Sequence, residues 1–203
     1  MKVNTTIRCI TFLIFAILAT ISCESLAQEK TANLIPEITI LRGDFLQIRY
    51  LKGFKNPLKS EGRFLVSVSK GVIWQTIKPF PSRILIRTSG DIVNLDRTIH
   101  TTTNQKKPNV AISKIMLAML SGDQTEIEKY FIIQRREQNG LWTLTLQPKG
   151  NMARVFLRIE MKGERYIHQV IMEEKSGDKT ELNFSAVSEV PNTLSAEELM
   201  SFK

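Results

Sequence analysis

Residues 61–93 read EGRFLVSVSKGVIWQTIKPFPSRILIRTSGDIV, and this stretch decides the fold. Apolar and polar side chains alternate along it with a period of two, which is the pattern of β-strands. The pattern covers three segments, residues 63–70, 72–78 and 82–88. Gly71 and the Pro79-Phe80-Pro81 triplet separate them, because glycine interrupts a strand and proline removes a ladder donor. The stretch therefore predicts three short strands of an antiparallel meander.

The three segments differ in how much of their surface is apolar. The middle one is apolar on both faces, since Trp74 alternates with Ile73 and Ile77, so we expect a central or covered strand. The outer two are apolar on one face only. The side chains that we expect on the inner face are Phe64, Val66, Val68, Ile84 and Ile86.

Helical spacing marks a second important element, residues 109–120, NVAISKIMLAML. Its apolar residues recur at i, i+3, i+4 and i+7, and Ser121-Gly122 predicts its end. Because so few of its side chains are polar, protein or ligand must cover nearly all of it. Plain core is the commoner reason for such a helix, but methionine also suits a surface that adapts to varied ligands.

The remaining elements are predicted from the same signals. We expect a first helix over residues 30–41 that closes at Gly43-Asp44, a helical turn over 123–129, and a short C-terminal helix over 195–202 with a Ser195/Glu198 capping box. Asn139-Gly140 predicts a hairpin turn. The further predicted strands are 45–51, two short ones within 92–101, 130–136, 141–147, one in which Val155, Leu157, Ile159 and Met161 alternate, 165–173, and a last one with Leu182, Phe184 and Ala186 inward. Residues 52–60 are predicted to be a loop. The total of about ten strands and two main helices, with no repeat, indicates one antiparallel sheet that curls on itself.

Residues 1–27 have the features of a secretion signal. A basic start precedes an apolar run over residues 9–19, and Ser25-Leu26-Ala27 is a small-x-small cleavage site. The run is too short to span a bilayer comfortably. We therefore expect export and a single mature domain over residues 28–203, with an uncleaved anchor as the alternative.

Both cysteines, Cys9 and Cys23, lie in this segment, so the predicted mature chain has no disulfide and its stability must come from its core. Lipidation of Cys23 is a second alternative, although Thr20 stands where a lipobox needs an aliphatic residue.

The charge of the chain is strongly basic, with 28 Lys and Arg against 20 Asp and Glu. The basic residues are scattered along strand faces and turns, without the aromatic interleaving of a nucleic-acid reader. We therefore interpret the charge as a solvated surface and expect no nucleic-acid partner.

Catalytic and metal-binding motifs are nearly missing. His100 and His168 lack a Cys or His partner at metal spacing, so we expect neither a metal site nor another cofactor. Ser67 and Lys70 match an S-x-x-K pattern, but a strand would place them on opposite faces. We expect a binding protein without enzymatic activity. An exported acyl-hydrolase that uses Ser67 and His168 is the alternative from another class.

Several short motifs give the chain a family resemblance from about Phe45 to Val187. The sequence resembles the LolA family of periplasmic outer-membrane lipoprotein carrier proteins. The motifs that carry the resemblance are Phe45-x-Gln47, Gly62-Arg63-Phe64, Ile73-Trp74, the proline turn, Ile84-Leu85-Ile86, Gly90-Asp91, Thr145-Leu146-Gln147-Pro148-Lys149 and Ile167-His168-Gln169.

The resemblance implies an α+β, mainly β fold: a half-open barrel of one curved antiparallel sheet, covered by a helical lid. It implies a periplasmic, monomeric shuttle that takes acylated lipoproteins from an inner-membrane transporter to an outer-membrane acceptor. Periodicity alone does not distinguish a filled barrel from a hollow one. The residues expected to bind acyl chains are Phe64, Val66, Val68, Trp74, Ile84, Ile86, Ile112, Ile115, Met116, Met119, Trp142 and Leu144.

One departure from the family concerns the latch of the lid. Family members carry an arginine before the tryptophan strand, and that arginine bonds to the lid, whereas here Lys70 is the nearest cation. Lysine offers a point charge in place of a planar fork. Two alternatives of the same fold therefore remain open, a carrier of another lipid and a lipid-anchored outer-membrane acceptor that resembles LolB.

Overall fold

The computed structural model describes residues 39–96 and 110–203, all of them within the unit Asn33–Lys203. The predicted signal segment, most of the predicted first helix and the second of the two strands expected within residues 92–101 lie outside the described residues.

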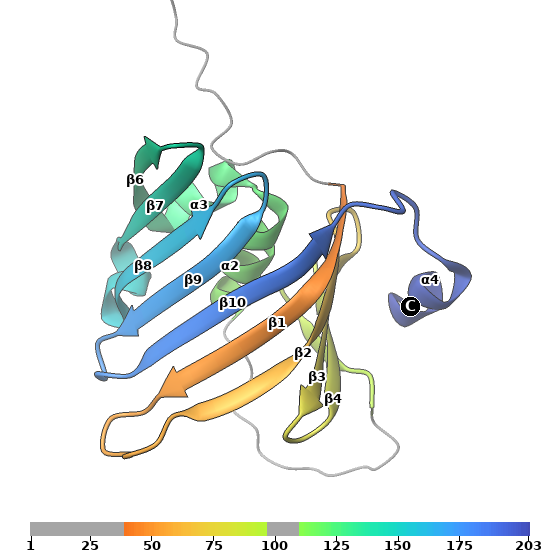
Figure 1. The fold of residues 1–203 in the computed structure, drawn as a ribbon, viewed down its shortest axis with the longest axis horizontal. Coiled ribbons are helices and arrows are strands. Elements are labelled where there is room, and N and C mark those ends of the chain that lie inside the picture. The colour runs from red at the N-terminus through yellow and green to blue at the C-terminus, as the bar shows by residue number, and fades with distance from the viewer. Residues whose placement is uncertain (1–38, 97–109) are drawn as a thin grey trace, which may run out of the picture. The chain divides into compact units, whose positions relative to one another are not determined.

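Ten strands form a single antiparallel sheet (Figure 1). They are β1 (Ile40–Tyr50), β2 (Leu58–Ser67), β3 (Gly71–Lys78), β4 (Ser82–Arg87), β5 (Ile92–Asn94), β6 (Phe131–Gln138), β7 (Leu141–Pro148), β8 (Phe156–Gly163), β9 (Ile167–Glu174) and β10 (Lys179–Ser188). Their order across the sheet is β5-β4-β3-β2-β1-β10-β9-β8-β7-β6. The sheet is curved but not closed, because β5 and β6 are its two ends. The mainly β, half-open architecture expected from the sequence is thereby confirmed in its coarse form.

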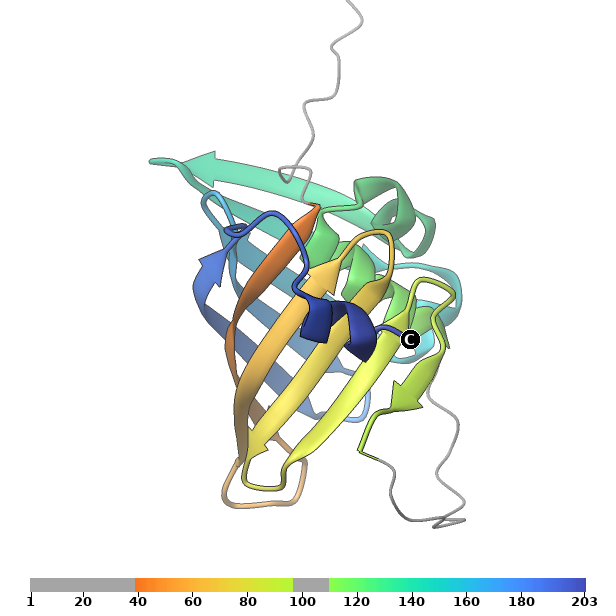
Figure 2. The same ribbon diagram turned by 90° about the vertical axis from the view of Figure 1, so that its right-hand side faces the viewer.

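The helices are short and lie on both faces of the sheet. They are α2 (Val110–Ser121), α3 (Gln124–Tyr130), the 3-10 helix η1 (Gly150–Arg154) and α4 (Ala196–Ser201). Helix α2 lies against the concave face and α4 against the outer face of β1–β4 (Figure 2). The predicted capping box is present at α4, where Ser195 Oγ accepts from the Glu198 amide and the Glu198 side chain accepts from the Ser195 amide.

The predicted meander is confirmed as β2, β3 and β4. Gly71 has φ +125°, and a Cβ there would lie 2.1 Å from the Ile86 carbonyl oxygen, so the start of β3 requires glycine. Strand β2 begins at Leu58, inside the segment predicted to be a loop, because it pairs with β1 along its whole length. The Asn139-Gly140 hairpin is also confirmed, with φ of 53° and 78° as a type I′ turn requires.

The prediction that a helix extends to Leu41 and closes at Gly43-Asp44 was wrong. These residues belong to β1, which begins at Ile40. Gly43 lies inside the strand because the Phe64 ring occupies the space of a side chain, with a Cβ at Gly43 only 2.7 Å from Phe64 Cε1. Gly43 therefore makes room for a ring and does not end a helix.

Two strands depart from their predicted alternation for a common reason, an irregularity in strand pairing, and Ala186, expected inward, is one of the residues affected. The register of β8 with β9 shifts between Phe156 and Arg158, so Phe156 is buried and Leu157 is 55% exposed. The register of β1 with β10 shifts between Arg42 and Asp44, opposite Ala186, which is exposed with φ +51°. Such a shift moves the following side chains to the other face.

The sheet buries apolar residues on both faces. The larger cluster lies between α2, α3, η1 and the concave face. The smaller cluster lies on the outer face, where Ile73 and Leu85 pack together and Leu194 and Phe202 cover them from the C-terminal segment. Ile73 is 7% exposed, which confirms that the first half of the middle strand is covered on both faces, whereas Ile77 near its end is 41% exposed.

Candidate functional site

An aromatic cluster fills the concave face at β1, β2, β3 and β10. The rings of Phe45 and Trp74 stack with centroids 3.8 Å apart, and Phe64 meets Phe184 edge to face at 5.4 Å. These rings are packed against one another, so this half of the interior is full.

Helix α2 crosses the concave face and contributes apolar side chains to it. Ile115, Ala118, Met119 and Leu120 are buried. Ser121 Oγ donates to the Ala118 carbonyl of the same helix. Within residues 114–121, whose side chains are described, no side-chain hydrogen bond or ion pair joins α2 to the sheet. Apolar contact therefore holds this part of the helix in place.

A cavity of about 110 Å³ lies between α2 and strands β8, β9 and β10. Every side chain in its wall is apolar: Ile115, Met116, Met119, Leu120, Phe156, Ile159, Val170, Met172, Leu182 and Phe184. An apolar cavity of roughly 150 Å³ stays dry and holds one benzene molecule. The space under α2 is smaller than that, so an acyl chain of many carbons fits only if α2 moves.

The residues predicted to bind acyl chains lie in three places. Three of them, Ile115, Met116 and Met119, line the cavity. The next group belongs to the same concave cluster but lies outside the cavity wall: Phe64, Val66, Trp74, Ile84, Ile86, Trp142 and Leu144. Val68 lies one residue beyond β2 and is 44% exposed, which places it outside the concave core. The side chain of Ile112 is not among those described.

Lys70, expected as a latch for the lid, lies exposed in the β2–β3 turn. Its backbone amide donates to the Ser67 carbonyl. No ion pair or side-chain hydrogen bond joins Lys70 to another described residue.

Sequence reasoning missed the strand side of the cavity. Phe156, Val170 and Met172 were not among the expected binding residues, although Val170 and Met172 alternate within a segment that was predicted to be a strand. Alternation identifies an inward face, but the space left over depends on the volumes of all facing side chains.

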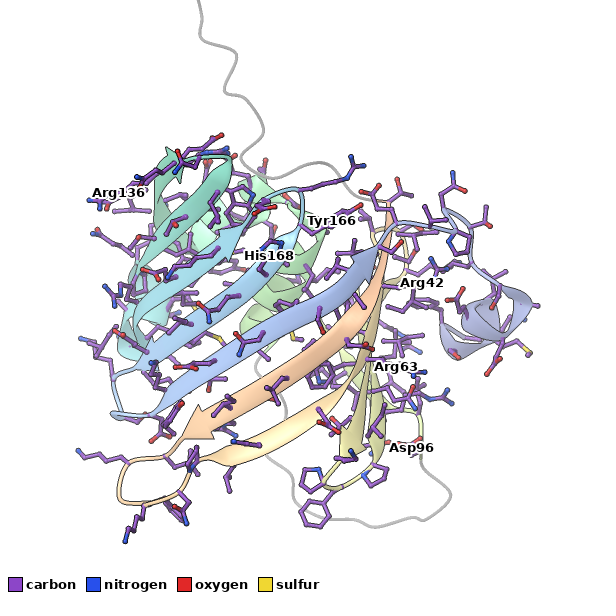
Figure 3. The ribbon with its side chains drawn as sticks, viewed as in Figure 1. Arg42, Arg63, Asp96, Arg136, Tyr166 and His168 are labelled. Carbon is purple, nitrogen blue, oxygen red and sulfur yellow. The ribbon has the colours of Figure 1, made fainter. Side chains whose placement is uncertain are left out.

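A larger groove of about 490 Å³ lies on the outer face, between α4 and strands β1–β4. Its lining contains two ion pairs, Arg42 with Glu198 and Arg63 with Asp44. Arg42 bonds to Glu198, and this hydrogen bonding lowers the pKa of Glu198 to about 2 and raises the pKa of Arg42. Figure 3 shows Arg42 directed toward α4. The mixed, charged lining does not suit an acyl chain, so we take the apolar cavity as the candidate site.

The pair required by the acyl-hydrolase alternative is not assembled. Ser67 lies on β2 and His168 on β9, with β1 and β10 between them (Figure 3 labels His168). Three strand spacings alone put about 14 Å between these two strands. Among the described residues, no group of His, Cys, Asp and Glu is arranged to hold a metal ion. None of the described helices has the length and hydropathy to cross a bilayer.

Comparison with known proteins gives one family and several distant structures. The family model of the outer membrane lipoprotein carrier protein LolA matches residues 37–198. No curated protein sequence matches the chain. Among solved structures, a LolA superfamily protein from Nitrosomonas europaea is 10% identical, with a TM-score of 0.44 over 78% of this chain and 90% of that one. MucB is also 10% identical, with a TM-score of 0.44, and the match covers 82% of this chain and 59% of that one.

Proposed function

Because the chain belongs to the family of the outer membrane lipoprotein carrier protein LolA, we propose that it is a periplasmic carrier that shelters the acyl chains of lipoproteins beneath α2. In this proposal it receives a lipoprotein from a transporter of the inner membrane and delivers it to an acceptor of the outer membrane. It binds its cargo without chemical change.

The observation that carries the proposal is the apolar helix over an apolar void. Helix α2 is held by apolar contacts along residues 114–121, and the cavity beneath it has no polar atom in its wall. Each CH₂ group removed from water contributes about 0.8 kcal/mol, so part of one acyl chain offsets several kcal/mol of exposure. A site of this composition favours hydrocarbon over any polar ligand.

Binding in this proposal requires α2 to move, because the present cavity of about 110 Å³ is too small for the cargo. Acyl contacts then replace the contacts of α2 with the sheet. The net affinity is the difference between two similar free energies, which keeps release possible. The cavity wall makes the first contacts, and the rest of the concave cluster, including Trp74 and Trp142, becomes available as α2 withdraws.

No single described residue of the site selects lipoproteins over other acyl lipids, so the proposed cargo includes both. Lys70 has no described partner on α2, so the proposal includes no polar latch there. A carrier of another acyl lipid uses the same cavity, and a lipid-anchored acceptor differs only at its N-terminus. The two are distinguished by the bound molecule and by the mass of the purified protein.

The experiment is purification of the protein after export, under native conditions, followed by lipid extraction and mass spectrometry. We expect acylated peptides or acyl lipids in near-equal molar amount to the protein. Intact mass beginning at Gln28 excludes lipidation of Cys23. A protein that carries no lipid and does not bind a fluorescent fatty acid would refute the carrier function.

A further inference from the structure

Two loops of the sheet present exposed phenylalanines. Phe54 is 68% exposed and Phe80 is 81% exposed. A turn displays Phe54, whose amide donates to the Leu51 carbonyl at 3.0 Å while Gly53 adopts φ +88°. Phe80 lies between Pro79 and Pro81, and proline fixes φ on both sides of it. The backbone of each turn thus places its phenylalanine at the surface.

The strand register places the two loops at the same end of the sheet. Tyr50, at the end of β1, pairs with Lys179 at the start of β10. Lys78, at the end of β3, pairs with Glu61 near the start of β2. The β1–β2 loop and the β3–β4 turn therefore leave the sheet at one end, as Figure 2 shows.

Lysines surround these phenylalanines, and three of them have no carboxylate partner among the described residues. We name the surface formed by Lys52, Phe54, Lys55, Lys59 and Phe80 the loop rim. Two carboxylates lie nearby, and only Glu61 is paired with a cation in the part of the chain that the structure describes. Asp178 accepts from the Lys52 amide at 2.9 Å, and Glu61 lies 2.6 Å from Lys78 Nζ. Three lysines outnumber the one carboxylate left without a cation, Asp178, so the loop rim combines a net positive charge with two exposed rings.

We propose that the loop rim docks on the surface of a bilayer that contains anionic lipid. Aromatic side chains favour the headgroup level of a bilayer, and lysines near an anionic surface gain electrostatic free energy. A protein partner is the less fitting occupant, because lysine is depleted in protein interfaces. Two separate rings among long lysine side chains can insert into a lipid surface, which has no fixed shape to complement.

The position of the apolar cavity relates this surface to the proposed carrier. Phe156 is the first residue of β8, and Met172 and Leu182 lie near the β9–β10 turn. This turn leaves the sheet at the same end as the loop rim, since Lys179 pairs with Tyr50. Docking would bring the cavity end of the sheet to the lipid. The inference goes beyond the proposed function and does not depend on it, because the loop rim and the cavity share no residue.

The test measures binding to sedimented vesicles, one set of phosphatidylcholine alone and one of equal parts phosphatidylcholine and phosphatidylglycerol. The protein is used as recovered after export, so every variant has the same N-terminus. We expect binding to the anionic vesicles only, and its loss at high salt. Phe54→Ser with Phe80→Ser should weaken binding more than about tenfold. Replacing Lys52, Lys55 and Lys59 by glutamine should weaken it about fivefold for each charge.

Matched controls come from the opposite end of the sheet. Arg87, Arg136 and Arg165 replaced by glutamine remove the same net charge, and Leu141→Ser removes an exposed apolar side chain. These controls should bind as the unchanged protein does. Equal binding to both vesicle types, no binding at all, or loop-rim variants that bind like the controls would overturn the inference. Fatty-acid binding, measured in parallel, reports on the carrier function alone and should be the same in every variant.

Discussion

Arg42 on β1 and Glu198 on α4 form a two-point ion pair, with Arg42 Nε 2.7 Å from Oε1 and Nη2 2.8 Å from Oε2. The same guanidinium donates to the carbonyl oxygens of Pro191 at 2.6 Å and Thr193 at 2.9 Å. One arginine thus joins the C-terminal segment to the outer face at four points. Because that segment covers Ile73, the pair protects the outer apolar cluster from water.

Arg42→Ala should release α4. Bidentate, charge-assisted hydrogen bonds are stronger than neutral ones, so we expect unfolding to become easier by about 2 kcal/mol. Amide hydrogen exchange in α4 should also become faster. Arg63→Ala is the control, because Arg63 Nε lies 3.6 Å from Asp44 Oδ1 and its side chain is 73% exposed. Its loss should cost less than about 0.5 kcal/mol. Unchanged exchange in α4 after Arg42→Ala would contradict the role of the pair.

Acid should weaken the same contact. The pKa of Glu198 falls from an ordinary 4.5 to about 2, chiefly because Arg42 donates to the charged carboxylate. A carboxyl pKa that is lower in the folded state contributes stability above the unfolded value, and this contribution is lost as pH falls through the folded value. The difference in unfolding free energy between the unchanged protein and Glu198→Gln should therefore stay constant near neutrality. It should shrink below about pH 4.5. A gap that persists into strong acid would disprove this assignment.

Val170→Phe should close the apolar cavity. Val170 is 3% exposed and belongs to the cavity wall, so a larger ring takes up the space of about 110 Å³. We expect fluorescent fatty-acid binding to weaken by about tenfold, with stability changed by less than about 2 kcal/mol. Ile171→Phe, on the other face of β9, is the matched control and should bind normally. Equal affinities in the two variants would place the acyl chain elsewhere.

Gly62→Ala should be strongly destabilising. A Cβ at Gly62 would lie 1.9 Å from the Gln75 carbonyl oxygen and 2.9 Å from Phe45 Cε1. The strands must separate to admit it, so we expect a loss of more than about 3 kcal/mol in urea denaturation. In the control Gly53→Ala, the new Cβ has no atom within 4 Å, so the only cost in stability comes from the φ of +88°. That cost is about 1 kcal/mol. Similar losses at both sites would show that close approach at Gly62 is not the constraint.

Local chemistry explains which parts of the fold the sequence predicted. The meander and the Asn139-Gly140 hairpin depend on turn residues and on alternation within a few positions. Helix α2 follows from its spacing and from Gly122, which has φ +77° at its end. These signals lie within the segments themselves, so no knowledge of the partner strands was needed.

The predictions were wrong at positions whose conformation depends on residues far away in the sequence. Gly43 is an interior strand residue because of the Phe64 ring, and Ala186 turns outward because the β1 register shifts opposite it. The cavity lies by β8–β10 because the rings of Phe45 and Trp74 fill the other half. The volume of a cavity depends on all the side chains that face it, so the periodicity of one segment cannot predict it.

Strands β5 and β6 are the two edges of the sheet and do not pair with each other. This opening determines how far the interior can widen when a ligand enters. In a closed barrel, strand number and stagger fix the girth. Among the described residues no backbone ladder joins β5 to β6, so widening the sheet would break apolar contacts and leave the existing strand pairs intact. If the protein carries acyl lipids as proposed, an open sheet can adjust its width to acyl chains of different bulk, which a closed barrel of fixed strand number cannot do.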